Sequence, residues 1–81
     1  MKKQHNITLY KTLSCPFCHM TEKFFKENKV KYKSIDVGKD QKAAQEMIKK
    51  SGQMGVPVID INGTIIVGFN KAALRKTLGI K

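Results

Sequence analysis

The sequence has few cysteines and no long apolar run. Its only cysteines among 81 residues are Cys15 and Cys18, and a disulfide between them would close too short a loop to stabilise the fold. No apolar stretch approaches the length of a membrane span, and residues 1–6 do not resemble a signal peptide. We therefore expect a cytoplasmic protein with no membrane partner, a setting in which paired cysteines more often serve catalysis or metal binding than stability.

Acidic residues are also scarce. Asp and Glu total 6 against 16 Lys and Arg, which gives a formal net charge of +10. Such a balance can indicate nucleic-acid binding, but the lysines are scattered along the whole chain and only one of the 16 basic residues is arginine. We therefore expect a solvated basic surface that attracts acidic partners, and no dedicated nucleic-acid site.

The chain is organised around Cys15-Pro16-Phe17-Cys18. Residues 6–10 before this motif alternate in polarity and predict a strand. After the motif, the residues expected on a buried face recur at helical spacing and predict a helix from Pro16 to Asn28 or Lys29. Pro16 supports this start, because proline suits the first helical position. Its buried face is expected to consist of Phe17, Met20, Thr21, Phe24 and Phe25.

This placement puts Cys15 at the positive end of a helix, with backbone N–H groups directed toward its sulfur. Such a setting favours the thiolate, which is the nucleophilic form of cysteine. Cys18 faces the same side and is close enough to form a disulfide with Cys15. The motif thus predicts an attacking thiolate with a resolving partner. Lys11, in the preceding loop, is expected either to approach the thiolate or an anionic substrate or to serve solubility alone. His19 can border the same patch, but we expect it to be an exposed first-turn residue with a modest electrostatic effect.

The rest of the chain continues to alternate between strands and helices. After a loose basic leader over residues 1–5, the expected elements beyond the first helix are a strand over 30–37, a helix over 41–50, strands over 58–61 and 64–67, and a helix over 70–78. Asp40 is a plausible N-cap of the helix over 41–50, and Gly52 and Gly79 are expected to end the two helices. Asn62-Gly63 is a strong signal for a hairpin between the last two strands. Lys31 and Lys33 are typical of an edge strand.

The order β-α-β-α-β-β-α predicts one α/β domain over residues 1–81. A four-stranded mixed sheet with three helices on its faces accounts for every element, and the first strand–helix–strand unit implies a parallel pair. In the helix over 41–50 the expected apolar stripe consists of Ala43, Ala44, Met47 and Ile48.

Three other interpretations of the cysteines stay open. A structural zinc site needs four ligands, and only Cys15, Cys18, His19 and His5 are available, at a poor spacing. Residues 15–19 also match the C-x-x-C-H pattern of c-type haem attachment, which usually belongs outside the cytoplasm. Two buried cysteines without chemistry would leave Pro16 and the preceding loop unexplained. We expect no bound metal.

Four stretches together resemble the glutaredoxin family of the thioredoxin fold, over residues 6–80. They are Ile7-Thr8-Leu9-Tyr10, Cys15-Pro16-Phe17-Cys18-His19, Gly55-Val56-Pro57-Val58 and Val67-Gly68-Phe69. The resemblance implies a thioredoxin/glutaredoxin fold and a thiol–disulfide oxidoreductase, with Cys15 as nucleophile and Cys18 as resolving cysteine. It also implies a cis Val56–Pro57 bond facing the cysteines, with the Val56 backbone pairing with the substrate. The implied substrate-binding residues are Lys11, Pro16, Phe17, Val56, Pro57, Gly68, Phe69 and Asn70.

The chain departs from the glutaredoxin pattern at three places. Phe17 replaces the usual tyrosine, Gly55 replaces a threonine, and Gly68-Phe69-Asn70-Lys71 replaces Gly-Gly-x-Asp. Phe69 is expected to crowd the glutathione groove, and Lys71 stands where a carboxylate would meet the glutathione ammonium, although N–H groups near Asn70 can still receive a carboxylate. Thioredoxin itself fits less well, because Leu9 stands at the position of its buried acid.

The Gly-Phe variant is similar to the glutaredoxin-like redoxins that reduce ribonucleotide reductase with electrons from thioredoxin reductase. By resemblance, the protein is expected to be a monomer without a tightly bound cofactor. Its expected substrates are protein disulfides, with ribonucleotide reductase among the candidates, or glutathione mixed disulfides. Glutathione and thioredoxin reductase are the alternative reductants. A nonenzymatic carrier of metal or an iron–sulfur cluster is the alternative from another class.

Overall fold

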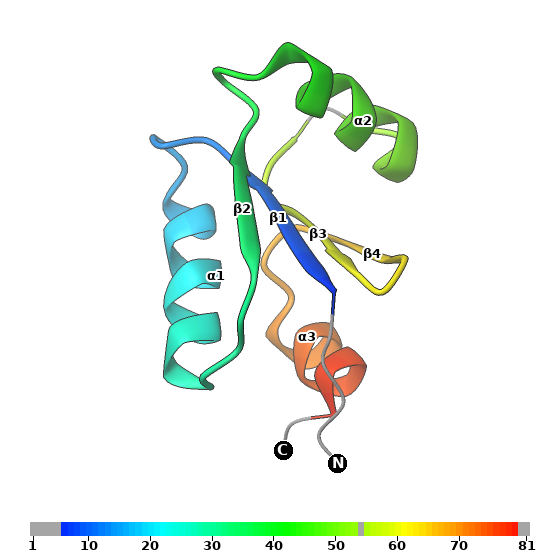
Figure 1. Ribbon diagram of the computed structural model, residues 1–81. Helices are drawn as coiled ribbons and strands as arrows, with labels where there is room; N and C mark the ends of the chain where they lie inside the picture. Colours follow the sequence, from blue (N-terminus) through cyan, green and yellow to red (C-terminus); the bar gives the residue numbers. More distant parts are fainter. Residues whose placement is uncertain (1–5, 54, 80–81) are drawn as a thin grey trace.

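The computed structural model describes residues 6–53 and 55–79 and shows the predicted order of strands and helices (Figure 1). The predicted leader and the candidate ligand His5 lie outside these residues. No helix in the described ranges is long and apolar enough to cross a membrane. The elements are β1 (Ile7–Lys11), α1 (Pro16–Glu27), β2 (Lys33–Asp36), α2 (Gln41–Ser51), β3 (Val58–Ile61), β4 (Thr64–Val67) and α3 (Lys71–Leu78).

The four strands form one mixed sheet in the order β2-β1-β3-β4. β1 and β2 are parallel, with Thr8 opposite Lys33, whereas β3 is antiparallel to both β1 and β4. The predicted hairpin is confirmed: Asn62 and Gly63 both have positive φ, 54° and 94°, as a type I′ turn requires. β2 lies at the edge of the sheet, as Lys31 and Lys33 predicted, although Lys31 precedes the strand.

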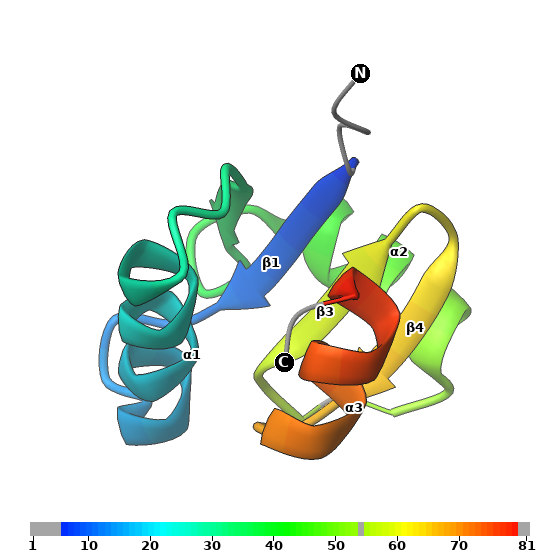
Figure 2. The ribbon, with the colours of Figure 1, turned by 90° about the horizontal axis from the view of Figure 1, so that it is seen from below.

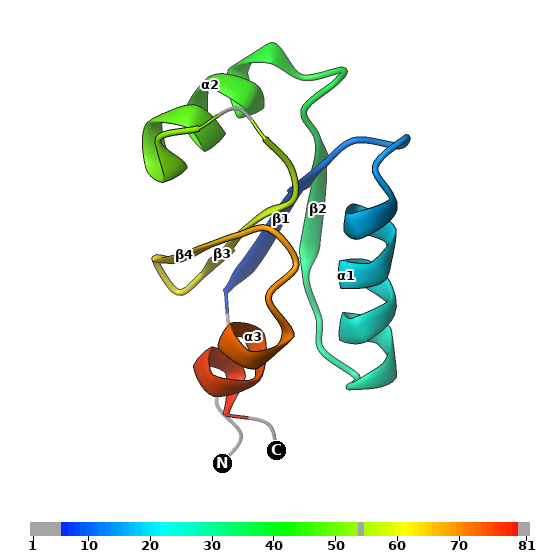
Figure 3. The same ribbon diagram turned by 180° about the vertical axis from the view of Figure 1, so that it is seen from behind.

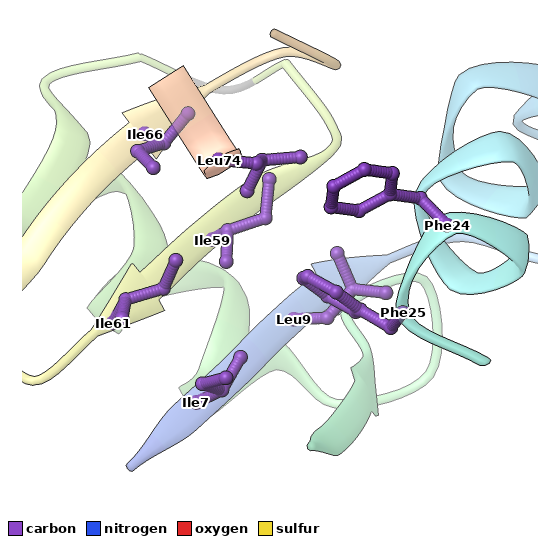
Figure 4. Close-up of a cluster of buried hydrophobic side chains, with 8 residues drawn as sticks. All are labelled: Ile7, Leu9, Phe24, Phe25, Ile59, Ile61, Ile66 and Leu74. Carbon is purple, nitrogen blue, oxygen red and sulfur yellow. The ribbon is translucent and has the colours of Figure 1, made fainter. Parts of the chain in front are cut away.

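Alternation along the strands divides the core into two layers. α1 and α3 cover one face of the sheet and α2 covers the other (Figures 2 and 3). The first layer contains Ile7, Leu9, Phe24, Phe25, Ile59, Ile61, Ile66 and Leu74 (Figure 4). The second contains Tyr10, Ala43, Met47 and Val58. Because strand side chains point to opposite faces in turn, neighbours such as Leu9 and Tyr10 contribute to different layers.

Strand β2 is shorter than the predicted strand over residues 30–37. Val30 belongs instead to the end of α1, where its N–H donates to Phe25 O at 2.8 Å and the Lys29 N–H donates to Lys26 O at 3.2 Å. These two bonds form a Schellman motif, with Lys29 in the left-handed conformation at φ 54°. Val30, a β-branched residue that favours a strand by its own preference, therefore belongs to the end of the helix.

The buried face of α1 also differs from the prediction. Thr21, Phe24 and Phe25 are buried as expected, but Phe17 and Met20 are 57% and 47% exposed. Phe24 is covered by Phe69, with ring centroids 6.3 Å apart, whereas Phe17 and Met20 lie nearer the start of the helix. Helical spacing indicates the side of a helix that faces a core, and packing decides how far along its length that side is covered.

Helix α2 shows the same effect on a smaller scale. Ala43 and Met47 are buried, but Ala44 is half-buried and Ile48 is exposed, so the predicted stripe is too wide. The caps are confirmed: the Asp40 carboxylate accepts from the Ala43 N–H at 3.1 Å, and Gly52 ends the helix at φ 75°. Gly79 likewise ends α3 at φ 72°.

Candidate thiol–disulfide site

Cys15 lies at the junction of β1 and α1 and caps the helix. Its backbone is extended, with φ −95° and ψ 111°, and its sulfur accepts a hydrogen bond from the Cys18 N–H at 3.3 Å. Pro16 follows in the first turn, where its missing N–H costs no helical hydrogen bond. A cap of this kind places a backbone donor on the sulfur and leaves the side chain partly exposed. Such a donor stabilises negative charge on sulfur.

Cys18 is completely buried directly behind this cap. Both cysteines are free thiols. Burial, assisted by the hydrogen bond with Cys15, raises the pKa of the Cys18 thiol to about 12. At neutral pH Cys18 is therefore protonated, and solvent or a large substrate meets Cys15 first. The two sulfurs differ in access, although they are only three residues apart in the sequence.

The segment before β3 lies close to the same sulfur. The Val56–Pro57 peptide bond is cis, which confirms the expectation from the resemblance. Cys15 Sγ lies 3.8 Å from the Val56 carbonyl oxygen, and the Gly68 N–H donates to Pro57 O at 2.8 Å. Gly68 has φ 77°, a conformation that favours glycine. The sheet thus brings together residues that are about forty positions apart in the chain.

The predicted residues Phe69 and Asn70 have structural contacts of their own. Phe69 is half-buried, and its ring forms a T-shaped pair with that of Phe24. The Asn70 side chain caps α3 by accepting from the Ala73 N–H at 3.1 Å. Only the exposed part of the Phe69 ring can border a substrate groove. The Asn70 side-chain oxygen already accepts the Ala73 N–H. Phe17, in contrast, projects into solvent one position before the buried Cys18.

The Lys11 ammonium is paired with a carboxylate of α1. Its Nζ is 3.2 Å from both carboxylate oxygens of Glu22, and the Tyr32 hydroxyl donates to the same carboxylate at 2.9 Å. Sequence reasoning missed Glu22 and Tyr32, although Glu22 lies one helical turn after Cys18 and its charge helps raise the Cys18 pKa. An acidic side chain therefore lies near the cysteines. It is Glu22 of α1, whereas in thioredoxin the acid occupies the strand position that is Leu9 here.

Burial alone would raise the pKa of Glu22, but the hydrogen bonds from Tyr32 and Lys11 outweigh it and lower the pKa below its ordinary value. A group with a depressed pKa in the folded state stabilises the fold above its unfolded pKa, and this stability is lost as pH falls through the folded pKa. We predict that Glu22→Gln lowers the free energy of unfolding at neutral pH by about 1–2 kcal/mol. Denaturant unfolding at neutral and strongly acidic pH measures this effect.

Glu27→Gln is the matched control, because Glu27 is exposed on the same helix and forms no ion pair in the described part of the chain. The difference between wild type and Glu22→Gln should shrink toward zero once Glu22 is protonated. A difference that is the same at both pH values would show that the ion pair is not its cause.

His19 is exposed, and its Nε2 lies 2.8 Å from the Leu13 carbonyl oxygen. Because a carbonyl oxygen only accepts, Nε2 is the donor in this bond. His19 therefore fastens the loop before Cys15 to the first turn of α1. Within residues 6–53 and 55–79, no group of three or more His, Cys, Asp or Glu side chains could hold a metal ion.

The geometry agrees with the comparisons to known proteins. The family model for glutaredoxin matches residues 7–66, which include both cysteines and the cis-proline segment. The chain belongs to the glutaredoxin family.

Relatives of this glutaredoxin cover most of its length. A glutaredoxin-like 8.6 kDa protein in the rubredoxin operon of Clostridium pasteurianum is 43% identical over 72 residues, covering 89% of this chain and 96% of that protein. Glutaredoxin 3 of Escherichia coli K12 is 30% identical over 63 residues, covering 78% and 76%. A mutant of the thioredoxin-like protein BC3987 has a TM-score of 0.88 at 32% identity, with both chains covered completely. Family and fold support a thiol–disulfide oxidoreductase-like function.

Proposed function

We propose that this glutaredoxin is a dithiol oxidoreductase in which Cys15 attacks and Cys18 resolves. The observation that carries the proposal is the contrast between the two sulfurs. Cys15 is partly exposed and accepts the Cys18 N–H at 3.3 Å, whereas Cys18 is completely buried behind it. A substrate disulfide can therefore reach Cys15 alone, and the resolving thiol is already beside the mixed disulfide that results.

In the first step, the Cys15 thiolate attacks one sulfur of the substrate disulfide. A bond forms between Cys15 and that sulfur, and the other substrate sulfur leaves as a thiolate and takes a proton. In the second step, Cys18 loses its proton and attacks the Cys15 sulfur, which releases the remaining substrate thiol and leaves a Cys15–Cys18 disulfide. The substrate gains two electrons, which an external thiol reductant later returns to the protein.

The surrounding residues support this reaction. The Val56 carbonyl oxygen, 3.8 Å from the Cys15 sulfur, lies where a substrate backbone can pair beside the reacting disulfide. Pro57 holds this segment against Gly68, and the exposed ring of Phe17 offers an apolar border that excludes water from the incoming sulfur. Phe69 and the helix start at Asn70 complete the proposed substrate groove. Lys11 is left out of it because its ammonium is paired with Glu22.

The proposed substrates are protein disulfides, including those of ribonucleotide reductase, or glutathione mixed disulfides. The proposed compartment is the cytoplasm, where cellular reductants keep such a dithiol reduced. No tightly bound cofactor is needed, because both electrons reside in the two thiols. Two reductants fit this chemistry, namely glutathione and thioredoxin reductase.

One coupled assay tests the function and distinguishes the two reductants. NADPH consumption is followed with a disulfide substrate in two arms, one with glutathione and glutathione reductase and the other with thioredoxin reductase alone. We expect turnover that depends on this protein in one of the arms. The Cys15→Ser variant is the control in both. If neither arm consumes NADPH above that control, while the Cys15 thiol of the folded protein reacts with a thiol reagent, the proposed function is wrong.

A further inference from the structure

Exposed apolar side chains gather around the Cys15 cap. In the described part of the chain, large hydrophobic side chains are exposed at five places, and three of them are Leu13 at 58%, Phe17 at 57% and Met20 at 47%. None of these three belongs to either core layer. The other two, Ile48 and Val67, lie on α2 and β4. Apolar side chains left exposed together mark an interaction surface more often than scattered ones do.

The loop that carries Leu13 is held in place. His19 Nε2 donates to the Leu13 carbonyl oxygen at 2.8 Å, and the Cys15 N–H bonds to Thr12 O at 3.4 Å. These contacts fasten the loop to the start of α1, so Leu13 is presented beside the same helix end as Phe17 and Met20. We call these three side chains the apolar rim.

Positive charge continues from the apolar rim along the outer face of α1. A shallow hollow there is lined by His19, Glu22, Lys23, Lys26 and Glu27. Of the two acids in this lining, Glu22 is already paired with Lys11. Lys23 and Lys26 form no ion pair with any described residue, and Glu27 offsets only one of their two charges, so the lining keeps a positive excess. The first turn of α1 contains no acidic residue, and the chain has a net charge of +10. A carboxylate-bearing partner would complement this face.

We propose that the protein substrate of Cys15 is an acidic polypeptide segment with an apolar residue beside its disulfide-bonded cysteine. The apolar residue docks on the apolar rim, and the carboxylates meet Lys23 and Lys26. This inference rests on the proposed function and names its substrate class. The covalent steps are those given above, because docking changes only how often and in which orientation the substrate disulfide meets Cys15.

Two peptides and one small molecule test the inference. Each peptide contains one cysteine, joined to a small uncharged thiol, and one neighbouring leucine; the other residues include aspartates in one peptide and lysines in the other. We expect kcat/KM at low salt to be about tenfold higher for the acidic peptide, and salt should reduce this preference. A small uncharged disulfide reports the chemistry alone.

Variants locate the docking surface. Lys23→Glu with Lys26→Glu should remove the preference for the acidic peptide, whereas Lys42→Glu with Lys49→Glu on α2, which changes the net charge equally, should leave most of it.

Leu13→Ser and Met20→Ser test the apolar rim. Each should raise KM for the acidic peptide severalfold and leave the rate with the small disulfide unchanged. Ile48→Ser, which removes an exposed apolar side chain on α2, is the control. Equal rates for the two peptides, or equal effects of the two lysine pairs, would overturn the inference. Failure to reduce even the small disulfide would instead overturn the proposed function, and the inference with it.

Discussion

Cys15→Ser is expected to abolish disulfide reduction, to the level measured without the protein. A serine hydroxyl cannot form the mixed disulfide, so the covalent route is closed, and no other exposed thiol replaces it among the described residues. NADPH consumption in the coupled assay measures the loss. The fold should persist, because Cys15 is partly exposed and serine is itself a favoured helix cap. Circular dichroism checks that it does.

Cys18→Ser separates the two roles. This variant should still cleave a glutathione mixed disulfide, if the protein uses glutathione, because the first step needs Cys15 alone. With a protein disulfide, the mixed disulfide at Cys15 should accumulate, and mass spectrometry under non-reducing conditions would detect it. Equal loss of activity from both substitutions on a glutathionylated substrate would contradict the assignment of roles.

Phe25→Ala is expected to lower the free energy of unfolding by about 3–5 kcal/mol. Phe25 is completely buried between β1 and α1, and its ring lies 4.9 Å from that of Tyr32 between centroids. Removing the ring loses apolar burial and leaves a cavity that the surrounding sheet cannot close. The loss is a large part of the roughly 5–15 kcal/mol that stabilises a typical domain. Denaturant unfolding measures it.

Phe17→Ala is the matched control on the same helix. Phe17 is 57% exposed, so its truncation should change stability by less than about 0.5 kcal/mol. A comparable loss of stability from both substitutions would mean that Phe17 packs against the core after all. Thermal unfolding of the two variants side by side makes the comparison direct.

Local signals predicted most of the fold correctly. Asp40, Gly52, Gly79 and Asn62-Gly63 mark helix caps and a hairpin through their own backbone preferences, and the structure has each of them where it was expected. The edge position of β2 was predicted from Lys31 and Lys33 and is confirmed. These signals are readable because a cap or a tight turn is specified by a few adjacent residues.

The candidate site was predicted in outline. Cys15 and Cys18 stood out because their spacing and the neighbouring proline describe a helix start. The cis Val56–Pro57 bond came from family resemblance, since the residues themselves do not distinguish a cis bond from a trans one. Glu22 was missed, because its role depends on Lys11 and Tyr32, which reach it from other elements.

The sequence by itself determined the order of the elements and the placement of a cysteine pair at a helix start, because both follow from periodicity and from the preferences of neighbouring residues. Only the tertiary structure decided that Cys18 is buried while Phe17 and Met20 are exposed, and that Lys11 binds Glu22. The reason is physical. Burial and pairing depend on which distant surface covers a residue, and that surface forms only when the sheet brings remote segments together.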